Sequence, residues 1–123
     1  MPAKILVIDD EVEITSLLKK FLEKEGYETV TANSAKDGIE KLQTEKPDVI
    51  LLDIRMPEMN GLEAMKKIRK IDPEIAVIMA TAVVDDKVVE EVVKMEATDY
   101  IVKPFDLDYL KKVLLVKIAT LTE

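Results

Sequence analysis

The sequence contains no cysteine and no histidine. The absence of cysteine excludes disulfide bonds, thiol catalysis and thiolate metal sites. The absence of histidine removes the most frequent general base and zinc ligand, and it excludes a phosphohistidine within this chain. Any chemistry in this protein must therefore come from carboxylates, lysine, threonine and a bound metal ion.

Long apolar runs and an excess of positive charge are also missing. No segment is long enough to cross a bilayer, and no basic start precedes an apolar stretch typical of a secretory signal. We therefore expect a bacterial cytoplasmic protein without a membrane partner. The net charge of −7 argues against direct nucleic-acid binding, which requires a basic surface. The 123 residues are 48% hydrophobic, which predicts one globular domain over residues 1–123.

Segments typical of strands alternate with segments typical of helices along the whole chain. The first, third and fourth strands are almost continuously apolar, as expected for strands that are covered on both faces. The second alternates threonine with apolar residues, which favours the edge of a sheet. The alternation with short connections predicts a parallel α/β sandwich of three layers. The predicted strands are Lys4–Ile8, Glu28–Ala32, Asp48–Leu52, Ile75–Ala80 and Asp99–Val102.

The clearest helix follows the first strand. Its apolar stripe at helical spacing consists of Ile14, Leu17, Leu18, Phe21 and Leu22. Gly26 fits the C-terminal cap of this helix, and Ser34 fits the N-cap of the next. Gly61 precedes the predicted third helix, Asp85 or Asp86 is suited to cap the fourth, and Asp106 is suited to cap the fifth.

Polar residues stand where the predicted strands end. Asp9 and Asp10 follow the first strand, Asp53 the third, Thr81 the fourth and Lys103 the fifth. In an open parallel sheet the carboxyl ends of the strands form one edge, and ligands bind there. Three carboxylates gathered at one place repel each other. A hard divalent cation with oxygen ligands makes such a cluster tolerable.

These residues belong to five motifs that resemble the receiver domain of two-component response regulators. Each motif is a weak signal by itself, but all five in order are specific, and the resemblance covers nearly the whole chain. It implies a three-layer (βα)5 fold with a doubly wound parallel five-stranded sheet, flavodoxin-like, of strand order 2-1-3-4-5. The motifs are Val7-Ile8-Asp9-Asp10-Glu11, Leu52-Asp53-Ile54-Arg55-Met56-Pro57, Asn60-Gly61, Ala80-Thr81-Ala82 and Asp99-Tyr100-Ile101-Val102-Lys103-Pro104-Phe105.

The resemblance implies a phosphorylation site at Asp53. The phosphoryl group would come from the phosphohistidine of a sensor histidine kinase or a phosphotransfer protein. Mg²⁺, for which Mn²⁺ can substitute, would be bound directly by Asp10, Asp53 and the backbone carbonyl of Arg55, and through a water by Asp9. Asp9 and Asp10 also suit the start of a helix, where acidic side chains interact favourably with the helix dipole.

The resemblance also implies roles for residues at the ends of the last two strands. Lys103 and Thr81 would contact the phosphoryl group. Tyr100 matches the aromatic residue whose rotamer follows the Thr81 position, so these two residues would form the switch. The Lys103–Pro104 peptide bond would be cis. The domain would be a signalling switch with its own phosphorylation and dephosphorylation activity, rather than a metabolic enzyme.

Two features leave alternatives open. Glu96 stands where receivers commonly have glycine, so either a left-handed residue costs about 1 kcal/mol there or the turn is rearranged. The fourth and fifth predicted helices carry more apolar residues than one buried stripe requires. The surplus predicts either a wide core or an interface, such as a homodimer, over the fourth helix, fifth strand and fifth helix. The apolar residues are Val84, Val88, Val89, Val92 and Val93, then Leu107, Leu110, Val113, Leu114, Leu115, Val116, Ile118 and Leu121.

The sequence names neither the kinase nor the process that the domain regulates. Whether the domain acts alone or precedes an output domain also stays open. A receiver that switches without phosphate would need a damaged acidic pocket, and this one is complete. Phosphohydrolases with an aspartate nucleophile carry it after the first strand, with a second aspartate two residues later. Here the paired acids are adjacent and Asp53 follows the third strand.

Overall fold

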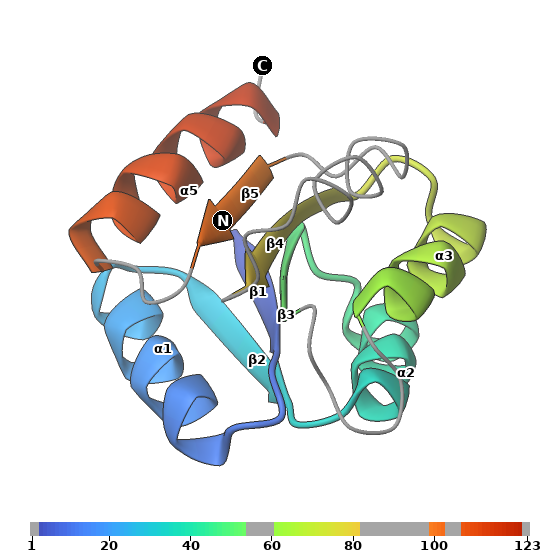
Figure 1. The fold of residues 1–123 in the computed structure, drawn as a ribbon. Helices are drawn as coiled ribbons and strands as arrows, with labels where there is room; N and C mark the ends of the chain where they lie inside the picture. Colours follow the sequence, from blue (N-terminus) through green and yellow to red (C-terminus); the bar gives the residue numbers. More distant parts are fainter. Residues whose placement is uncertain (1–2, 54–60, 82–98, 103–106, 122–123) are drawn as a thin grey trace.

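The computed structural model describes residues 3–53, 61–81, 99–102 and 107–121, which contain five strands and four helices (Figure 1). No helix within these ranges is long and apolar enough to span a membrane. In chain order the elements are β1 (Lys4–Ile8), α1 (Val12–Lys24), β2 (Glu28–Ala32), α2 (Ala35–Glu45), β3 (Val49–Asp53), α3 (Gly61–Ile71), β4 (Ala76–Thr81), β5 (Asp99–Val102) and α5 (Leu107–Leu121).

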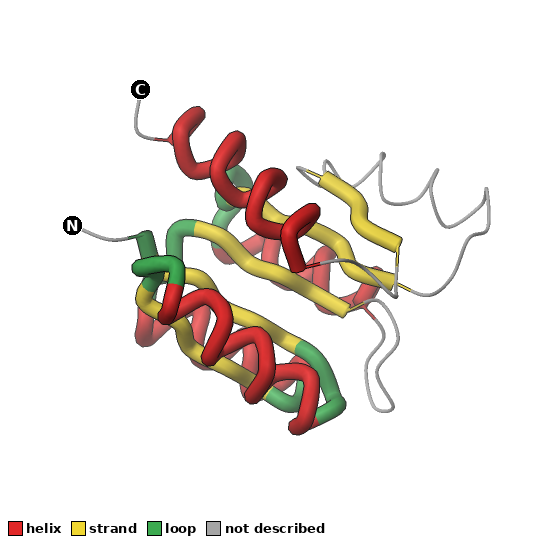
Figure 2. Tube along the Cα trace, turned by 90° about the vertical axis from the view of Figure 1, so that its left-hand side faces the viewer, coloured by secondary structure: helices red, strands yellow, loops and turns green. Residues whose placement is uncertain are grey.

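The five strands form one parallel sheet in the order β2-β1-β3-β4-β5. Helices α1 and α5 lie on one face of the sheet, and α2 and α3 lie on the other (Figures 1 and 2). The predicted order, the three layers and the edge position of the second strand are confirmed. The predicted fourth helix, with its caps Asp85 or Asp86, and Glu96 all lie outside the described residues, as does Asp106.

Each face of the sheet contributes to its own hydrophobic core. Ile5 and Val7 point into the core under α1 and α5, whereas Leu6 and Ile8 point into the core under α2 and α3. All four side chains are at most 1% exposed. A central strand that is covered on both faces needs apolar residues at every position, which explains the continuous apolar runs in the sequence.

The buried face of α1 differs from its predicted stripe. Leu18 and Leu22 are buried, but Leu17 is 52% exposed, so its prediction as a core residue is wrong. Instead, Thr15 is only 2% exposed. The helix is rolled toward Thr15, whose hydroxyl donates to the carbonyl of Val12 and accepts from Nδ2 of Asn33. This roll turns Leu17 outward.

Capping residues fix the C-terminus of α1 and the N-terminus of α2 as predicted. Gly26 has a φ of 95°, its N–H donates to the carbonyl of Glu23, and the N–H of Tyr27 donates to the carbonyl of Leu22. This pair of bonds is a Schellman motif. At the start of α2, the Ser34 hydroxyl accepts a 3.1 Å hydrogen bond from the N–H of Asp37. The two caps set where the chain turns back toward the sheet.

Lysines from both faces cover the open edge of β2. The Nζ atom of Lys19, on α1, donates to the carbonyl of Thr29 at 3.0 Å. The Nζ atom of Lys41, on α2, donates to the carbonyl of Thr31. Neither threonine pairs with β1 through its backbone polar groups, because the β1 bonds alternate through Glu28, Val30 and Ala32. Lysines placed in this way discourage the addition of another strand.

The contact between α2 and β1 yields a stability prediction. A Cβ atom added at Gly38 would lie 2.5 Å from Cδ1 and 2.7 Å from Cγ1 of Ile8, which is itself 1% exposed. Gly38→Ala should therefore destabilise the protein by about 1–3 kcal/mol, since overpacking outweighs the better helix propensity of alanine. Denaturant unfolding measures this loss.

The matched control removes the nearer of the two contacted atoms. Ile8→Val lacks Cδ1, so Gly38→Ala should cost less in the Ile8→Val background than in the native chain. A gain in stability from Gly38→Ala alone would show that the helix stands farther from β1 than described.

Candidate functional site

Three carboxylates gather at the carboxyl edge of the sheet. Asp9 follows β1, Asp10 is the next residue, and Asp53 is the last residue of β3. One carboxylate oxygen from each lies within 4.8 Å of those of the other two. Asp9 and Asp53 are 3% and 6% exposed, and Asp10 is partly exposed. The structure thus brings together the three side chains that the sequence predicted as neighbours.

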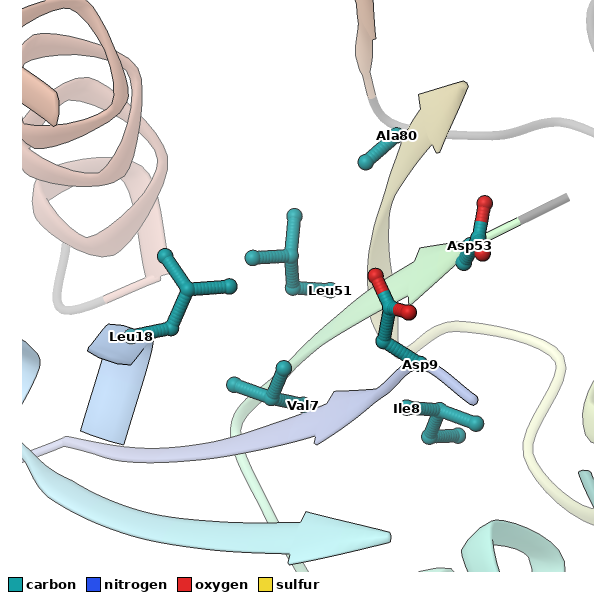
Figure 3. A pocket seen from close by; sticks show the side chains of 7 residues that line it. All are labelled: Val7, Ile8, Asp9, Leu18, Leu51, Asp53 and Ala80. Atoms are coloured by element: carbon teal, nitrogen blue, oxygen red, sulfur yellow. The ribbon is translucent and has the colours of Figure 1, made fainter. Parts of the chain in front are cut away.

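Strand pairing and alternation place Asp9 and Asp53 on the same side of the sheet. β1 and β3 are neighbours, with Ile8 opposite Leu52, so the next residue of each strand is an aspartate. Side chains two residues apart along a strand share a face of the sheet. Asp9 therefore lies on the same face as Val7, and Asp53 on the same face as Leu51. Figure 3 shows both carboxylates at adjoining strand ends. The small pocket beneath them is lined by Val7, Ile8, Asp9, Leu18, Leu51, Asp53 and Ala80.

Asp53 lies inside the sheet rather than after it. β3 extends to Asp53, which pairs with Ala80 of β4, so the predicted end of this strand at Leu52 was one residue short. The fourth strand likewise extends to Thr81 instead of ending at Ala80. Pairing on β4 fixes the backbone of Asp53, and its carboxylate is therefore positioned by a residue inside the sheet.

Hydrogen bonds fix both the backbone and the side chain of Asp9. Its N–H donates to the carbonyl of Ala32 at 3.1 Å. Its carbonyl accepts from Nδ2 of Asn33 at 2.9 Å, and its Oδ1 accepts from the N–H of Glu11 at 3.0 Å. Since one oxygen of the Asp9 carboxylate is engaged at the start of α1, this residue both organises the helix and contributes to the acidic cluster.

Two residues near the cluster were missed in the sequence. Asn33 follows β2 directly, so the strand-end rule that identified Asp9 and Asp53 could have found it. Thr15 lies within a helix between Ile14 and Ser16, and no sequence pattern distinguishes a buried threonine there. Asn33 Nδ2 donates to Thr15 Oγ1 at 3.0 Å, and the Thr15 hydroxyl donates to the carbonyl of Val12 at 3.0 Å.

The remaining predicted site residues are described in part or not at all. Thr81 ends β4 opposite Val102 of β5, so the backbone of Thr81 reaches the same edge of the sheet as Asp53. Tyr100 is in β5, opposite Met79. Arg55, Lys103 and Pro104 lie outside the described residues, so the metal contact of Arg55, the pairing of Lys103 and the cis bond before Pro104 stay predictions.

The donor set of the cluster suits a hard divalent cation. All three groups are carboxylates, and Mg²⁺ and Mn²⁺ prefer oxygen ligands over nitrogen or sulfur. Three like charges this close together repel each other, and two of them are nearly buried, where water screens the repulsion poorly. A cation among them would relieve this repulsion, so the residues fit the metal site that the sequence predicted.

The comparison with known proteins identifies the family. A profile of the response regulator receiver domain matches residues 5–115. The chain belongs to this family. It is 41% identical over 106 residues to the chemotaxis protein CheY of Thermotoga maritima, covering 85% of this chain and 88% of that protein. It is 36% identical over 111 residues to sporulation initiation phosphotransferase F of Bacillus subtilis, covering 90% of each.

Solved structures and longer relatives agree with this assignment. A response regulator receiver domain protein from Clostridium thermocellum matches with a TM-score of 0.91 at 34% identity, over 98% of this chain and 97% of that one. The regulatory protein AtoC of Escherichia coli is 38% identical over 107 residues, which are 23% of its length. The chain is thus a receiver domain of two-component systems, a family whose partners are histidine kinases or phosphotransfer proteins.

The acidic cluster predicts opposite effects of one substitution on stability and on metal binding. Asp10→Asn removes one of three like charges, so the metal-free variant should unfold at a higher temperature than the native chain. Mg²⁺ should stabilise the native chain by about 2.7 kcal/mol at 100 times its dissociation constant, and the variant much less. Thermal unfolding with and without Mg²⁺ measures both effects.

Glu40→Gln is the matched control, because it removes the same charge from an exposed position on α2. It should leave the response to Mg²⁺ unchanged. An Asp10→Asn variant that responds to Mg²⁺ as the native chain does would exclude Asp10 as a ligand.

Proposed function

We propose that this receiver is switched by phosphorylation of Asp53. The phosphoryl group comes from the phosphohistidine of a sensor histidine kinase or a phosphotransfer protein, in a reaction that depends on Mg²⁺ or Mn²⁺. The observation that carries the proposal is the cluster of Asp9, Asp10 and Asp53, with Asp53 fixed by the pairing of β3 on β4. Because these 123 residues contain no histidine, the phosphohistidine lies outside this sequence.

The metal would be bound by Asp10, Asp53 and the backbone carbonyl of Arg55. Asp9 would contact it through a water, a role supported by the hydrogen bond that already engages Oδ1 of Asp9. When bound, the ion supplies positive charge that neutralises the oxygens of the phosphoryl group during transfer. The protein itself contributes the fixed positions of the carboxylates.

The transfer begins when a carboxylate oxygen of Asp53 attacks the phosphorus atom in line with the bond that breaks. A P–O bond forms, the P–N bond to the imidazole breaks, and the electron pair stays on the imidazole nitrogen. The product is a mixed anhydride. The switch is reset by hydrolysis. A water attacks the phosphorus, the P–O bond to Asp53 breaks, and Asp53 returns as a carboxylate with release of inorganic phosphate. Both steps are activities of the domain itself.

Thr81, Lys103 and Tyr100 would transmit the new charge. A phosphoryl group adds about −1.5 to −2 charges, which the Thr81 hydroxyl and the Lys103 ammonium group would contact. The strand register supports a common role for Thr81 and Lys103, because Thr81 lies opposite Val102 and Lys103 is the residue after Val102. Movement of Thr81 toward the phosphoryl group would then let Tyr100 of β5 rotate inward.

The output surface would comprise the fourth helix, β5 and α5. Helix α5 supports this part of the proposal, because Tyr109, Leu115 and Val116 are 51%, 51% and 62% exposed while Leu110 and Leu114 are buried. Such a surface suits a homodimer or an output partner. The domain would comprise residues 1–123, act in the cytoplasm and bind no nucleic acid directly, in keeping with its charge of −7.

Modification at Asp53 is the direct test. An acyl phosphate or beryllofluoride should modify the native chain stoichiometrically, and only when Mg²⁺ or Mn²⁺ is present. Asp53→Asn should abolish this modification, because the amide is no nucleophile. Intact-mass measurement detects the acyl phosphate product and fluorine NMR detects beryllofluoride. Glu40→Gln should react as the native chain does, and full modification of Asp53→Asn would refute the assignment.

The exposed part of α5 offers a second test. Beryllofluoride should increase self-association of the native chain, and Leu115→Ser should reduce this increase. Leu17→Ser is the matched control, because Leu17 on α1 is 52% exposed and Leu115 is 51% exposed. Sedimentation velocity measures association for all three proteins. Equal effects of the two substitutions, or none, would place the output surface elsewhere.

A further inference from the structure

The amide of Asn33 connects three segments of the chain next to the acidic cluster. Its Nδ2 donates to the carbonyl of Asp9 at 2.9 Å and to Oγ1 of Thr15 at 3.0 Å. Asn33 itself is exposed, but Asp9 and Thr15 are only 3% and 2% exposed. The amide group of exposed Asn33 therefore provides the hydrogen-bond donor for two buried residues, Asp9 and Thr15.

Hydrogen-bond chemistry fixes which end of the amide faces inward. The carbonyl of Asp9 can only accept, so the group opposite it must be the NH2 group of Asn33. The hydroxyl of Thr15 donates to the carbonyl of Val12, which leaves its oxygen to accept the second amide hydrogen. Both hydrogens of the amide then have partners, and Thr15 holds Asn33 in the orientation that Asp9 requires.

The bond to Asp9 replaces a bond of the β-sheet. Along the β1–β2 ladder the N–H of Asp9 donates to the carbonyl of Ala32. In a parallel ladder the carbonyl of Asp9 would next accept from the N–H of Ser34. β2 ends at Ala32, however, and Ser34 is already the N-cap of α2. The side chain of Asn33 supplies the missing donor, so the sheet continues one bond beyond its last paired residue.

That one bond acts on the peptide that joins Asp9 to Asp10. With the N–H and the carbonyl of Asp9 both bonded to consecutive residues of the β2 end, this peptide cannot rotate freely. Its orientation sets the direction in which the Asp10 side chain leaves the backbone. We infer that Asn33, held by Thr15, is a positioning residue that sets the Asp10 carboxylate against Asp53 for metal binding.

This inference rests on the proposed function, since it assigns Asn33 a role at the same metal site. Partners that orient metal ligands typically change affinity by 10–100-fold when they are removed. Because Asn33 is exposed and water can replace part of its bond, we expect the lower end of that range. Asn33→Ala should therefore weaken Mg²⁺ binding about tenfold.

Thr15 provides a graded test of the same contact. Thr15→Val keeps the shape but removes the hydroxyl that orients Asn33, so it should weaken Mg²⁺ binding by a smaller factor than Asn33→Ala. Thr15→Ser keeps the hydroxyl and should restore the native affinity. Titration calorimetry with Mg²⁺ on the native chain and the three variants gives these dissociation constants.

Amide hydrogen exchange without metal separates positioning from general loss of stability. The N–H groups of Asp9 and Glu11 should lose protection in Asn33→Ala, whereas the N–H groups within β4 should keep it. Ile68→Val, in the core under α3, is the control for lowered stability, because Ile68 is 0% exposed and belongs to a different element. It should change global stability without changing the affinity for Mg²⁺.

The outcomes distinguish this inference from the proposed function. A native chain that binds no Mg²⁺ would overturn the metal site and the positioning role together. Native binding with unchanged affinity in Asn33→Ala would overturn only the role of Asn33. Weakening of the same size in Ile68→Val and Asn33→Ala would reduce Asn33 to a contributor to overall stability and also refute the inference.

Discussion

The parallel pairing of β1 with β3 is the constraint on which the candidate site depends. Ile8 lies opposite Leu52, and the residue after each is an aspartate on the same face of the sheet. A slip of one residue in either strand would turn its aspartate into the opposite layer. Both strands are apolar on both faces, and each face has its own core. Such a slip would therefore expose or misplace an entire row of buried side chains, so the two cores fix the geometry of the acids.

The same geometry works against stability. Like charges within 4.8 Å of each other raise the free energy of the folded state, and burial strengthens the effect. The structure compensates through hydrogen bonds to Asp9, whose carboxylate accepts the N–H of Glu11 at the start of α1. Helix initiation therefore uses a residue of the site. This double use explains why Asp9 and Asp10 fit both a helix start and a metal site in the sequence.

The sequence was sufficient for features that depend on short-range chemistry. Gly26 and Ser34 cap their helices as predicted, and the threonines of β2 correctly marked an edge strand. The strand ends brought Asp9, Asp10 and Asp53 together because a parallel sheet collects its carboxyl ends. The family resemblance added the strand order, which composition alone does not specify.

Features that depend on tertiary packing were not predictable. Leu17 matched the apolar stripe of α1, yet Thr15 is the buried residue, and its hydroxyl bonds to Asn33, which comes from another segment. The strand-end rule could have singled out Asn33, but its bonds to Asp9 and Thr15 exist only because β2 ends there and the ladder lacks a donor. The strand ends at Asp53 and Thr81 also depend on pairing with the neighbouring strand rather than on local sequence.

The two halves of the sheet differ in how firmly the described residues hold them. On the β2 side, Lys19 and Lys41 cover the edge and Asn33 extends the ladder. The C-terminus of α1 and the N-terminus of α2 are also capped there. On the opposite side, α5 leaves Leu115 and Val116 exposed. A bound group shifts an equilibrium only by its difference in affinity for two conformations. The bonds on the β2 side therefore support the proposal that phosphorylation of Asp53 would act through β4, β5 and α5 rather than through β2.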